Sequence, residues 1–197
     1  GKVFHELEEI KHNATSSGLL DVGGMDELLK VYIAWCGFLR RKAFEREDST
    51  EDDLDIAEVG IRSALEHVKE IGERKYGKEY KGDPQYRLER IHIKFYSQSG
   101  NTDAAKEIWR RLVPQVGDSY DFWYRYYIWE MVVYSKFAMR DNNTVHTRLP
   151  PPHEATAVLK QALKRIATLD WPEQLVSMFL NHCEQHESVQ EYRSAII

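Results

Sequence analysis

One stretch of thirteen residues, Asp118 to Glu130, carries seven aromatic side chains and constrains the fold more than any other segment. Read at 3.6 residues per turn, the stretch and its continuation give two apolar stripes. The first stripe holds Trp123, Tyr126, Tyr127, Glu130, Tyr134 and Phe137, and the second holds Phe122, Tyr126, Trp129 and Val133. A helix that is apolar on two sides packs against neighbours on two sides. The stretch therefore predicts a helix that lies between other helices.

The rest of the chain also follows the helical period, and no segment alternates with period two for long, so we predict an all-α fold. Helices are expected over residues 4–10, 25–46, 50–76, 83–99, 103–113, 118–140, 153–169 and 171–186, with another beginning at 188. The inward faces of the two longest are predicted at Leu28, Leu29, Tyr32, Trp35, Phe38 and Leu39, and at Leu54, Ala57, Ile61, Ala64, Leu65, Val68 and Ile71.

Glycine, proline and serine mark the expected breaks between these helices. Loops are predicted at 13–24, 77–82, 114–117 and 141–152, the last as a polar insertion. Ser49 and Thr50, followed by Asp52 and Asp53, have a pattern like that of a capping box. Asp83 before Pro84 reads as an N-cap followed by a proline at the first helical position. Asp170, before Trp171-Pro172, is expected to cap the helix that it precedes in the same way.

The helices come in pairs, and three segments share a small residue early and an apolar residue near the middle: 57–64, 105–112 and 155–162. Trp123 lies about one 34-residue repeat after the matching part of the preceding helix. Such a period is typical of a helical solenoid, in which each pair buries its face against the next pair. We therefore predict the end of a repeat at 1–24 and a repeat array at 25–197, divided at about 25–80, 83–116, 118–169 and 170–197.

Charge and composition narrow the class of protein. The 197-residue chain has 32 acidic and 27 basic residues, a formal net charge of −5, which argues against a dedicated nucleic-acid binder. Cys36 and Cys183 sit far apart in helical patterns and are expected as buried thiols in a reducing compartment. No apolar run approaches the roughly 20 residues of a membrane span, and no signal peptide is visible. The first residue, Gly1, and a pattern that continues to Ile197 suggest a fragment of a longer protein.

The spacing of Trp123, Tyr126 and Glu130, followed by an alanine-rich partner helix, resembles the half-a-TPR (HAT) repeat. Large aromatic residues on the first helix of such a pair fill the space left by small residues on the second. The resemblance implies that the repeat-motif core consists of Tyr32, Trp35, Trp109, Trp123, Tyr126 and Glu130. It also implies an α-solenoid of antiparallel helix pairs in an RNA-processing protein.

Several longer segments resemble the C-terminal half of the HAT domain in one family, the U4/U6 small nuclear ribonucleoprotein recycling factors, known as squamous-cell-carcinoma antigens recognised by T cells. They are 32–42 (YIAWCGFLRRK), 64–68, 105–109, 121–127 (DFWYRYY), 171–175 and 183–187. The resemblance covers most of the chain from Met25 onward. The insertion at 141–152 and Lys94, which stands where the repeat pattern has an aromatic residue, suggest a diverged, fungal-like member.

The resemblance implies a non-catalytic scaffold of a nuclear pre-mRNA splicing factor. In that family this half of the domain forms homodimers and docks ubiquitin-specific proteases, while RNA is bound mostly by RNA-recognition domains elsewhere in the protein. Two other readings stay open: a solenoid that itself binds RNA, and a HAT scaffold of another complex, such as the mRNA 3′-end cleavage factor. The net acidity counts against the RNA-binding solenoid. Dimerisation does not distinguish the splicing factor from the cleavage-factor scaffold, because both would dimerise.

Two kinds of candidate site have a simpler explanation. His182 and His186 lie four apart on one helix face, but Cys183 follows the first histidine where the zinc-protease motif has glutamate, so exposed polar side chains are expected. Three basic clusters, at 40–42, at 110–111 and at 160, 164 and 165, could contact phosphates. Solvated faces and intramolecular ion pairs are favoured instead. The chain shows no glycine-rich phosphate loop and no nucleophile motif, so we expect no catalytic, cofactor-binding or metal site.

The last predicted helices carry more apolar surface than the open end of a solenoid, which normally ends in a polar cap. A second copy of the chain could cover this surface through the same patch on both subunits. The candidates for such a homodimer interface are Trp171, Leu175, Met178, Phe179 and Tyr192.

Overall fold

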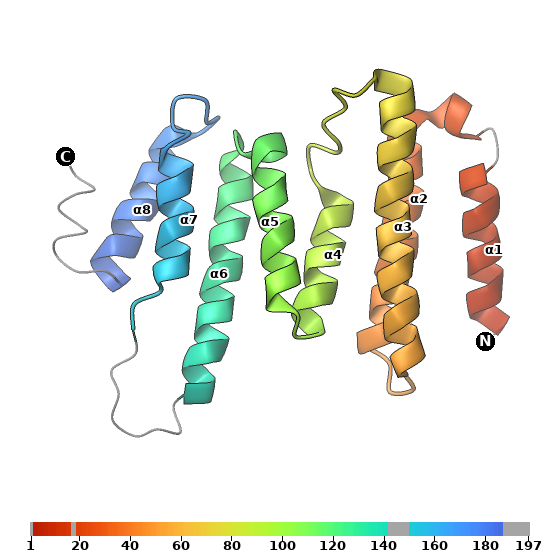
Figure 1. Ribbon diagram of the computed structural model, residues 1–197, viewed down its shortest axis with the longest axis horizontal. Coiled ribbons are helices and arrows are strands. Elements are labelled where there is room, and N and C mark those ends of the chain that lie inside the picture. Colours follow the sequence, from red (N-terminus) through yellow and green to blue (C-terminus); the bar gives the residue numbers. More distant parts are fainter. Residues whose placement is uncertain (1, 17–18, 142–149, 187–197) are drawn as a thin grey trace. The chain divides into compact units, whose positions relative to one another are not determined.

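The computed structural model describes residues 2–16, 19–141 and 150–186, without the side chains of 19–23 and 141. All secondary structure in these ranges is helical, which confirms the all-α prediction for them (Figure 1). The helices are α1 (Lys2–Ser16), α2 (Leu19–Phe44), α3 (Glu51–Tyr76), α4 (Arg87–Gln98), α5 (Thr102–Val116), α6 (Tyr120–Asp141), α7 (His153–Leu163) and α8 (Pro172–His186). Among the described residues, none of these helices is both long and apolar enough to cross a membrane. The chain forms two compact units, Gly1–Arg111 and Leu112–Ile197.

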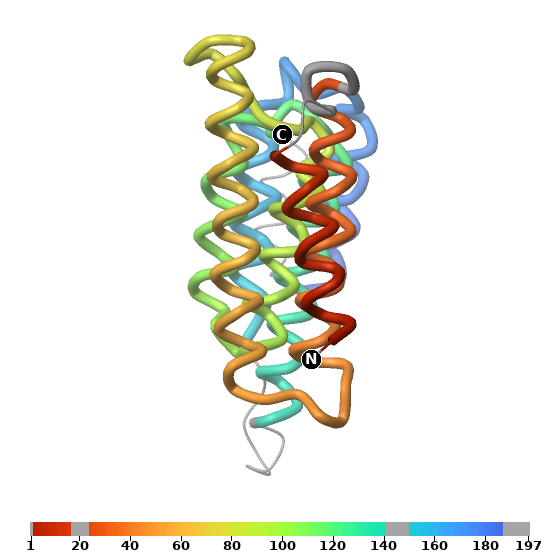
Figure 2. The backbone as a smooth tube through the Cα atoms, turned by 90° about the vertical axis from the view of Figure 1, so that its right-hand side faces the viewer, coloured from red at the N-terminus to blue at the C-terminus, as the bar shows by residue number. Residues whose placement is uncertain are grey.

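In the first unit, α2 packs against α1, α3 and α4, and α4 also packs against α3. Figure 2 shows the chain turning back after α2, so that α2 and α3 run antiparallel. The buried core includes Leu28, Leu29, Tyr32, Trp35, Cys36, Leu39, Ala57, Ile61, Ala64, Val68, Leu88 and Phe95. The predicted inward faces of α2 and α3 are therefore confirmed, with Phe38, Leu54, Leu65 and Ile71 partly buried against this core.

Small residues on α3 let α2 approach closely. Ala57 and Ala64 are buried, and a Cβ on Gly60 between them would overlap the side chain of Leu39 on α2. The start of α3 is fixed locally, because Thr50 and Asp53 form the predicted capping box. The Thr50 hydroxyl accepts a hydrogen bond from the Asp53 N–H (3.3 Å), and the Asp53 carboxylate accepts one from the Thr50 N–H (3.0 Å).

The N-terminal loop predicted at 13–24 is wrong for most of its length. Helix α1 continues to Ser16, and α2 already begins at Leu19. The hydroxyls of Thr15 and Ser16 donate to carbonyls of the preceding turn, at 2.9 Å and 2.6 Å, which makes serine and threonine compatible with a helix. Gly24 is the real break, since its φ of 72° lies in the left-handed region that favours glycine.

Two proline-based boundaries are also corrected. Helix α4 begins at Arg87 rather than Pro84, because the Asp83 carboxylate forms a turn by accepting from the N–H groups of Gln85 (3.1 Å) and Arg87 (3.0 Å). Pro114 lies inside α5, which runs to Val116 instead of ending near 113. A proline this close to the helix end removes a single ladder hydrogen bond, so the helix continues.

In the second unit, α6 packs against α7 and α8, and α7 packs against α8. Phe122 and Trp123, on the two predicted stripes of α6, are both fully buried. Other buried residues of this unit are Tyr126, Ala155, Val158, Leu159, Ala162, Leu175, Phe179 and Cys183. The first stripe ends earlier than predicted, because Phe137 is 56% exposed. Cys36 and Cys183 are both buried, as the sequence predicted.

Helix α7 ends at Leu163, six residues before the predicted boundary at 169, and a series of turns follows. These turns are joined to the start of α6. The Asp170 carboxylate accepts a hydrogen bond from the N–H of Tyr120 (2.8 Å), and the Thr168 hydroxyl donates to Asp118 (2.8 Å). Asp170, which precedes α8 in the sequence, thus accepts a hydrogen bond from the N-terminus of α6. Most of the predicted insertion at 141–152 lies outside the described residues, as does the helix expected from 188.

Candidate interaction surfaces

The six residues of the repeat-motif core are all buried: Tyr32, Trp35, Trp109, Trp123, Tyr126 and Glu130. In the second unit, the Trp123 indole donates a hydrogen bond to the carbonyl of Gly117 (2.7 Å) and stacks on Tyr126 at 6.1 Å. In the first, Tyr32 is paired through its hydroxyl with His67 Nδ1 (2.5 Å). These residues hold helices together, so a binding surface has to be sought among other side chains.

His182 is a buried part of the second unit, contrary to the expectation of an exposed polar side chain. It is 2% exposed, with Nδ1 2.8 Å from the Tyr127 hydroxyl and Nε2 2.7 Å from the Thr156 hydroxyl. Because the Thr156 hydroxyl also lies 3.1 Å from the carbonyl of Pro152 and donates there, it accepts from an Nε2–H of the histidine. One side chain therefore links α6, α7 and α8. Both ring nitrogens are occupied by these hydrogen bonds, and the described residues contain no cluster suited to a metal ion.

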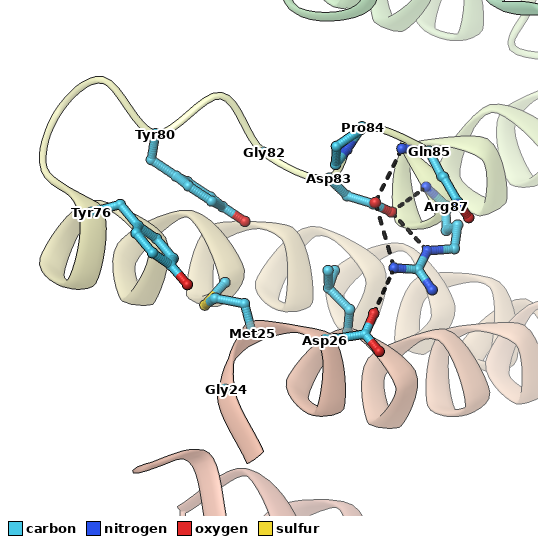
Figure 3. A pocket seen from close by; sticks show the side chains of 11 residues that line it. Gly24, Met25, Asp26, Tyr76, Tyr80, Gly82, Asp83, Pro84, Gln85 and Arg87 are labelled. Atoms are coloured by element: carbon cyan, nitrogen blue, oxygen red, sulfur yellow. Dashed lines mark hydrogen bonds and ion pairs between the residues drawn. The ribbon is translucent and has the colours of Figure 1, made fainter. Parts of the chain in front are cut away.

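A hollow of about 750 Å³ lies where the start of α2 meets the loop before α4 (Figure 3). Arg87 closes one side of it: Nε contacts the Asp83 carboxylate at 2.9 Å, and Nη2 contacts the Asp26 carboxylate at 3.1 Å. Burial by itself raises the pKa of Asp83, but hydrogen bonds from Arg87 and from the N–H groups of Arg87 and Gln85 outweigh it and lower that pKa. The ionic groups of this hollow satisfy one another, so they join α2 to α4.

The opposite wall of this hollow is aromatic. Tyr76 and Tyr80 stack at 5.8 Å, and the Tyr80 ring lies so close to Gly72 of α3 that a Cβ there would overlap it. Burial raises the pKa of the Tyr80 hydroxyl, with the Asp83 and Glu89 carboxylates adding to the effect. The glycine thus allows the loop to fold back over α3 and shapes the hollow.

A second hollow, of about 410 Å³, lies between α1 and α3 and is called here the α1–α3 groove. It is lined by Phe4, Glu8 and Lys11 of α1, Tyr32, Trp35 and Leu39 of α2, and Asp55, Ile56, Val59, Gly60, Ser63 and Ala64 of α3. Ile56 is 40% exposed and Val59 is 52% exposed. The groove therefore combines a buried aromatic floor with an exposed aliphatic wall and carboxylates at its edge.

The second unit exposes apolar side chains in a different form, as a stripe along α6. Tyr124, Ile128 and Val132 follow one another at intervals of four residues, and each is between 41% and 46% exposed. This set is called here the α6 stripe. Side chains spaced by four lie on one helix face, so the stripe is a continuous apolar surface.

The candidate dimer residues are distributed between surface and core. Trp171 is 55% exposed and rests edge-on against Tyr120, whereas Leu175 and Phe179 are buried inside the second unit. Leu175 and Phe179 support α8 from within and are not available to a second copy, which corrects their assignment. Met178 is partly buried, and Tyr192 lies outside the described residues.

Several cations of the basic clusters form ion pairs within the chain, as the sequence favoured. Arg40 is 7% exposed and donates to Glu45 and Gln98, both at 2.8 Å. Lys42 pairs with Asp53. Arg165 donates to the carbonyl of Gly117 (3.2 Å) and to the carboxylate of Asp118 (3.1 Å). These cations bind groups at helix ends and in loops of the same chain.

Comparison with known proteins relates the chain to a splicing factor. No family model matches it. It is 35% identical over 199 residues to the U4/U6 snRNA-associated-splicing factor PRP24 of Ophiostoma ulmi, a match that covers 96% of this chain. The chain spans 24% of the length of that relative. The resemblance found in the sequence is confirmed at the level of a splicing-factor relationship.

Proposed function

We propose that this chain is a non-catalytic scaffold segment of a nuclear pre-mRNA splicing factor that takes part in the assembly or recycling of the U4/U6 snRNP. The similarity to PRP24 carries this proposal, because it extends over 96% of the chain rather than over one helix pair. Within the described residues, buried polar side chains such as His182 and Arg40 link helices. Such a chain would act by holding partners.

We further propose that the helix pairs belong to a HAT-type α-solenoid. Support comes from the sizes of the buried side chains on two paired helices. Helix α6 contributes the large side chains of Phe122 and Trp123, and α7 contributes the small ones of Ala155 and Ala162. Since repeat helices bury their faces against neighbours, this arrangement suits an array that presents side chains along its length.

Homodimerisation and the docking of ubiquitin-specific proteases belong to the same proposal. Trp171 is the candidate dimer residue with the largest exposed fraction, 55%. Light scattering during size-exclusion chromatography tests the dimer: we expect the mass of two chains at micromolar concentration, and Trp171→Glu to lower it. A mass of one chain at every concentration would remove the dimer from the proposal.

A second candidate function, direct RNA binding, is favoured by the description of the relative as snRNA-associated. The formal net charge of −5 and the internal pairing of Arg40, Lys42 and Arg165 speak against a strong contribution. We therefore assign RNA contacts mostly to RNA-recognition domains outside this chain. The chain alone should bind U6-like RNA weakly and lose binding as salt rises. Sub-micromolar affinity that persists in 200 mM salt would favour the RNA-binding function instead.

A segment exchange tests the main proposal. The matching segment of PRP24 is replaced by this chain, and the chimera is expressed in cells depleted of the native protein. We expect recovery of U4/U6 association and of pre-mRNA splicing, because the chain would supply the same scaffold. A chimera carrying an unrelated helical-repeat segment of equal length serves as the control. Failure of a stably expressed chimera, with the same defect as the control, would contradict the proposed function.

A further inference from the structure

We propose that the α1–α3 groove is a docking site for a basic amphipathic helix of a partner protein. The inference rests on the scaffold function proposed above and specifies the chemistry of one partner segment. It follows from three properties of the groove: its apolar lining, its length and its charge.

The apolar lining is partly open to solvent. Tyr32 and Trp35 form a floor in which each residue is 8% exposed, while Ile56 and Val59 on α3 keep about half of their surface exposed. Gly60 brings α3 down onto this floor, since the indole nitrogen of Trp35 lies 3.9 Å from the position of a Cβ there. An apolar side chain that enters from outside would therefore meet aromatic and aliphatic surface on both sides, and its burial is favourable.

The length of the groove matches a short helix. Its lining residues on α3 run from Asp55 to Ala64, and those on α1 run from Phe4 to Lys11. At a rise of about 1.5 Å per residue, the α3 wall is about 13 Å long, and the lining positions on each wall repeat every three or four residues. Partner helices that bind in such grooves present anchors at i, i+4 and i+7. Two to three anchors would fill a groove of this length.

The edge of the groove is negatively charged. Glu8 and Asp55 line it, and Asp52 and Glu66 lie one turn beyond the lining residues on the same face of α3. Among the described residues, none of these four carboxylates forms an ion pair. The lining contains one basic side chain, Lys11, which lies over the Trp35 ring at 5.3 Å. Unpaired carboxylates around an apolar floor complement a helix whose apolar anchors are flanked by lysine or arginine.

The same charge pattern argues against other occupants. Phosphate groups of RNA would be repelled by the four carboxylates. A second copy of the chain would have to offer a basic amphipathic helix, and the basic side chains of α5 lie beside acidic ones, such as Arg110 beside Glu107. The α6 stripe does not have an unpaired carboxylate at its start, because Asp121 is paired there with Arg125 at 2.7 Å. Of the two apolar surfaces compared, the α1–α3 groove is therefore the one whose charge favours a basic partner.

Fluorescence anisotropy with a labelled synthetic peptide tests the proposal on the purified chain. The peptide is a helix of about 16 residues with leucine at i, i+4 and i+7 and lysine on both flanks. One control peptide carries glutamate in place of lysine, and another carries serine in place of leucine. The chain variants are Val59→Lys and Asp55→Lys in the groove. Val132→Lys on α6 and Glu79→Lys in the loop before α4 are matched controls, since both residues are exposed and lie outside the groove.

We expect the basic peptide to bind with a Kd in the micromolar range, both groove variants to weaken binding at least tenfold, and both control variants to leave it unchanged. Neither control peptide should bind comparably. Equal binding of the acidic peptide, equal effects of Val59→Lys and Val132→Lys, or no binding at all would overturn the proposal. So would a dimer that Val59→Lys converts to a monomer, because a second copy would then occupy the groove. The segment exchange described above does not depend on these outcomes, so the two proposals fail separately.

Discussion

The two units of this chain expose apolar surface in opposite ways. In the first unit, α1 and α3 flank α2 and leave the α1–α3 groove, whose floor is aromatic and whose edge carries unpaired carboxylates. In the second, the α6 stripe lies on the outside of one helix, next to the ion pair between Asp121 and Arg125. A groove offers burial on two sides and a charge pattern that selects partners, whereas a stripe offers burial on one side. Exposed apolar area alone therefore does not identify a docking site.

The interiors of the units differ as well. The first unit joins α2, α3 and α4 by an apolar core, with polar links from Arg40 to Gln98 and from Tyr32 to His67 beside it. The second unit places a polar side chain, His182, at the meeting point of three helices. Removal of an apolar core side chain leaves a cavity, whereas removal of one partner of a buried hydrogen-bonded bridge leaves a polar atom without its hydrogen bond. Substitutions in the two units should therefore have different consequences.

The largest expected effect concerns Trp123, whose fully buried ring fills the centre of the second unit. Trp123→Ala should lower the free energy of unfolding by about 3–5 kcal/mol. Trp171→Ala is the control. Because Trp171 is 55% exposed, this substitution should lower the free energy of unfolding much less. Urea denaturation of both variants measures the difference. A loss below about 1 kcal/mol for Trp123→Ala would mean that the aromatic helix is not the core of its unit.

The next effect is pH dependence in the first unit. His92 is 6% exposed, and burial, together with the nearby charges of Arg111 and Arg62, lowers its pKa to about 4. Between the unfolded value of about 6.5 and pH 4, the unfolded chain binds the proton more readily, so stability falls as pH falls through this window. His92→Gln should reduce the loss between these pH values by on the order of 2–3 kcal/mol. Urea melts at pH 7, 5.5 and 4.5 measure it, and an unchanged pH profile would contradict a buried neutral histidine.

A smaller effect is expected at the polar bridge of the second unit. Thr156→Val removes the hydroxyl that lies 2.7 Å from His182 Nε2 and leaves a buried nitrogen without that partner. We expect a loss of about 1–3 kcal/mol in unfolding free energy. Thr168→Val is the matched control, since its hydroxyl is exposed and its hydrogen bonds should cost less to remove. Equal losses for the two variants would show that the bridge adds no stability beyond a surface hydrogen bond.

The smallest effect is expected at the two apolar surfaces. Val59→Lys and Val132→Lys each replace an aliphatic side chain that is about half exposed, so each should change the unfolding free energy by no more than about 0.5 kcal/mol. Thermal melts followed by circular dichroism measure this. A large loss for Val59→Lys alone would show that the groove belongs to the core of the first unit.

Much of the fold could be predicted from the sequence, because periodicity and local caps are encoded by neighbouring residues. The inward faces of α2 and α3 and the Thr50–Asp53 box are examples. Several boundaries were missed for local reasons, such as the turn that the Asp83 carboxylate forms before α4. Contacts with distant partners could not be predicted at all. Asp170 precedes α8 in the sequence, yet its carboxylate binds the N–H of Tyr120 fifty residues away.

The candidate sites were harder to predict for the same reason. The exposed-histidine interpretation of His182 failed because its partners, Tyr127 and Thr156, come from two other helices. The α1–α3 groove was missed altogether, since its lining comes from three helices and no local pattern marks it. A usable signal was the group of acidic residues between 45 and 55, which lies close in sequence to the basic cluster at 40–42. Of these carboxylates, Asp53 does pair with Lys42, whereas Asp52 and Asp55 form no ion pair with the described residues.

Backbone amide chemical shifts in a ¹⁵N-labelled chain, titrated with the basic amphipathic peptide, test the contrast between groove and stripe most directly. We expect the largest changes at Lys11, Ile56 and Val59 around the α1–α3 groove, and little change at Ile128 and Val132 on the α6 stripe. Changes centred on Ile128 and Val132, with the groove unaffected, would contradict the account.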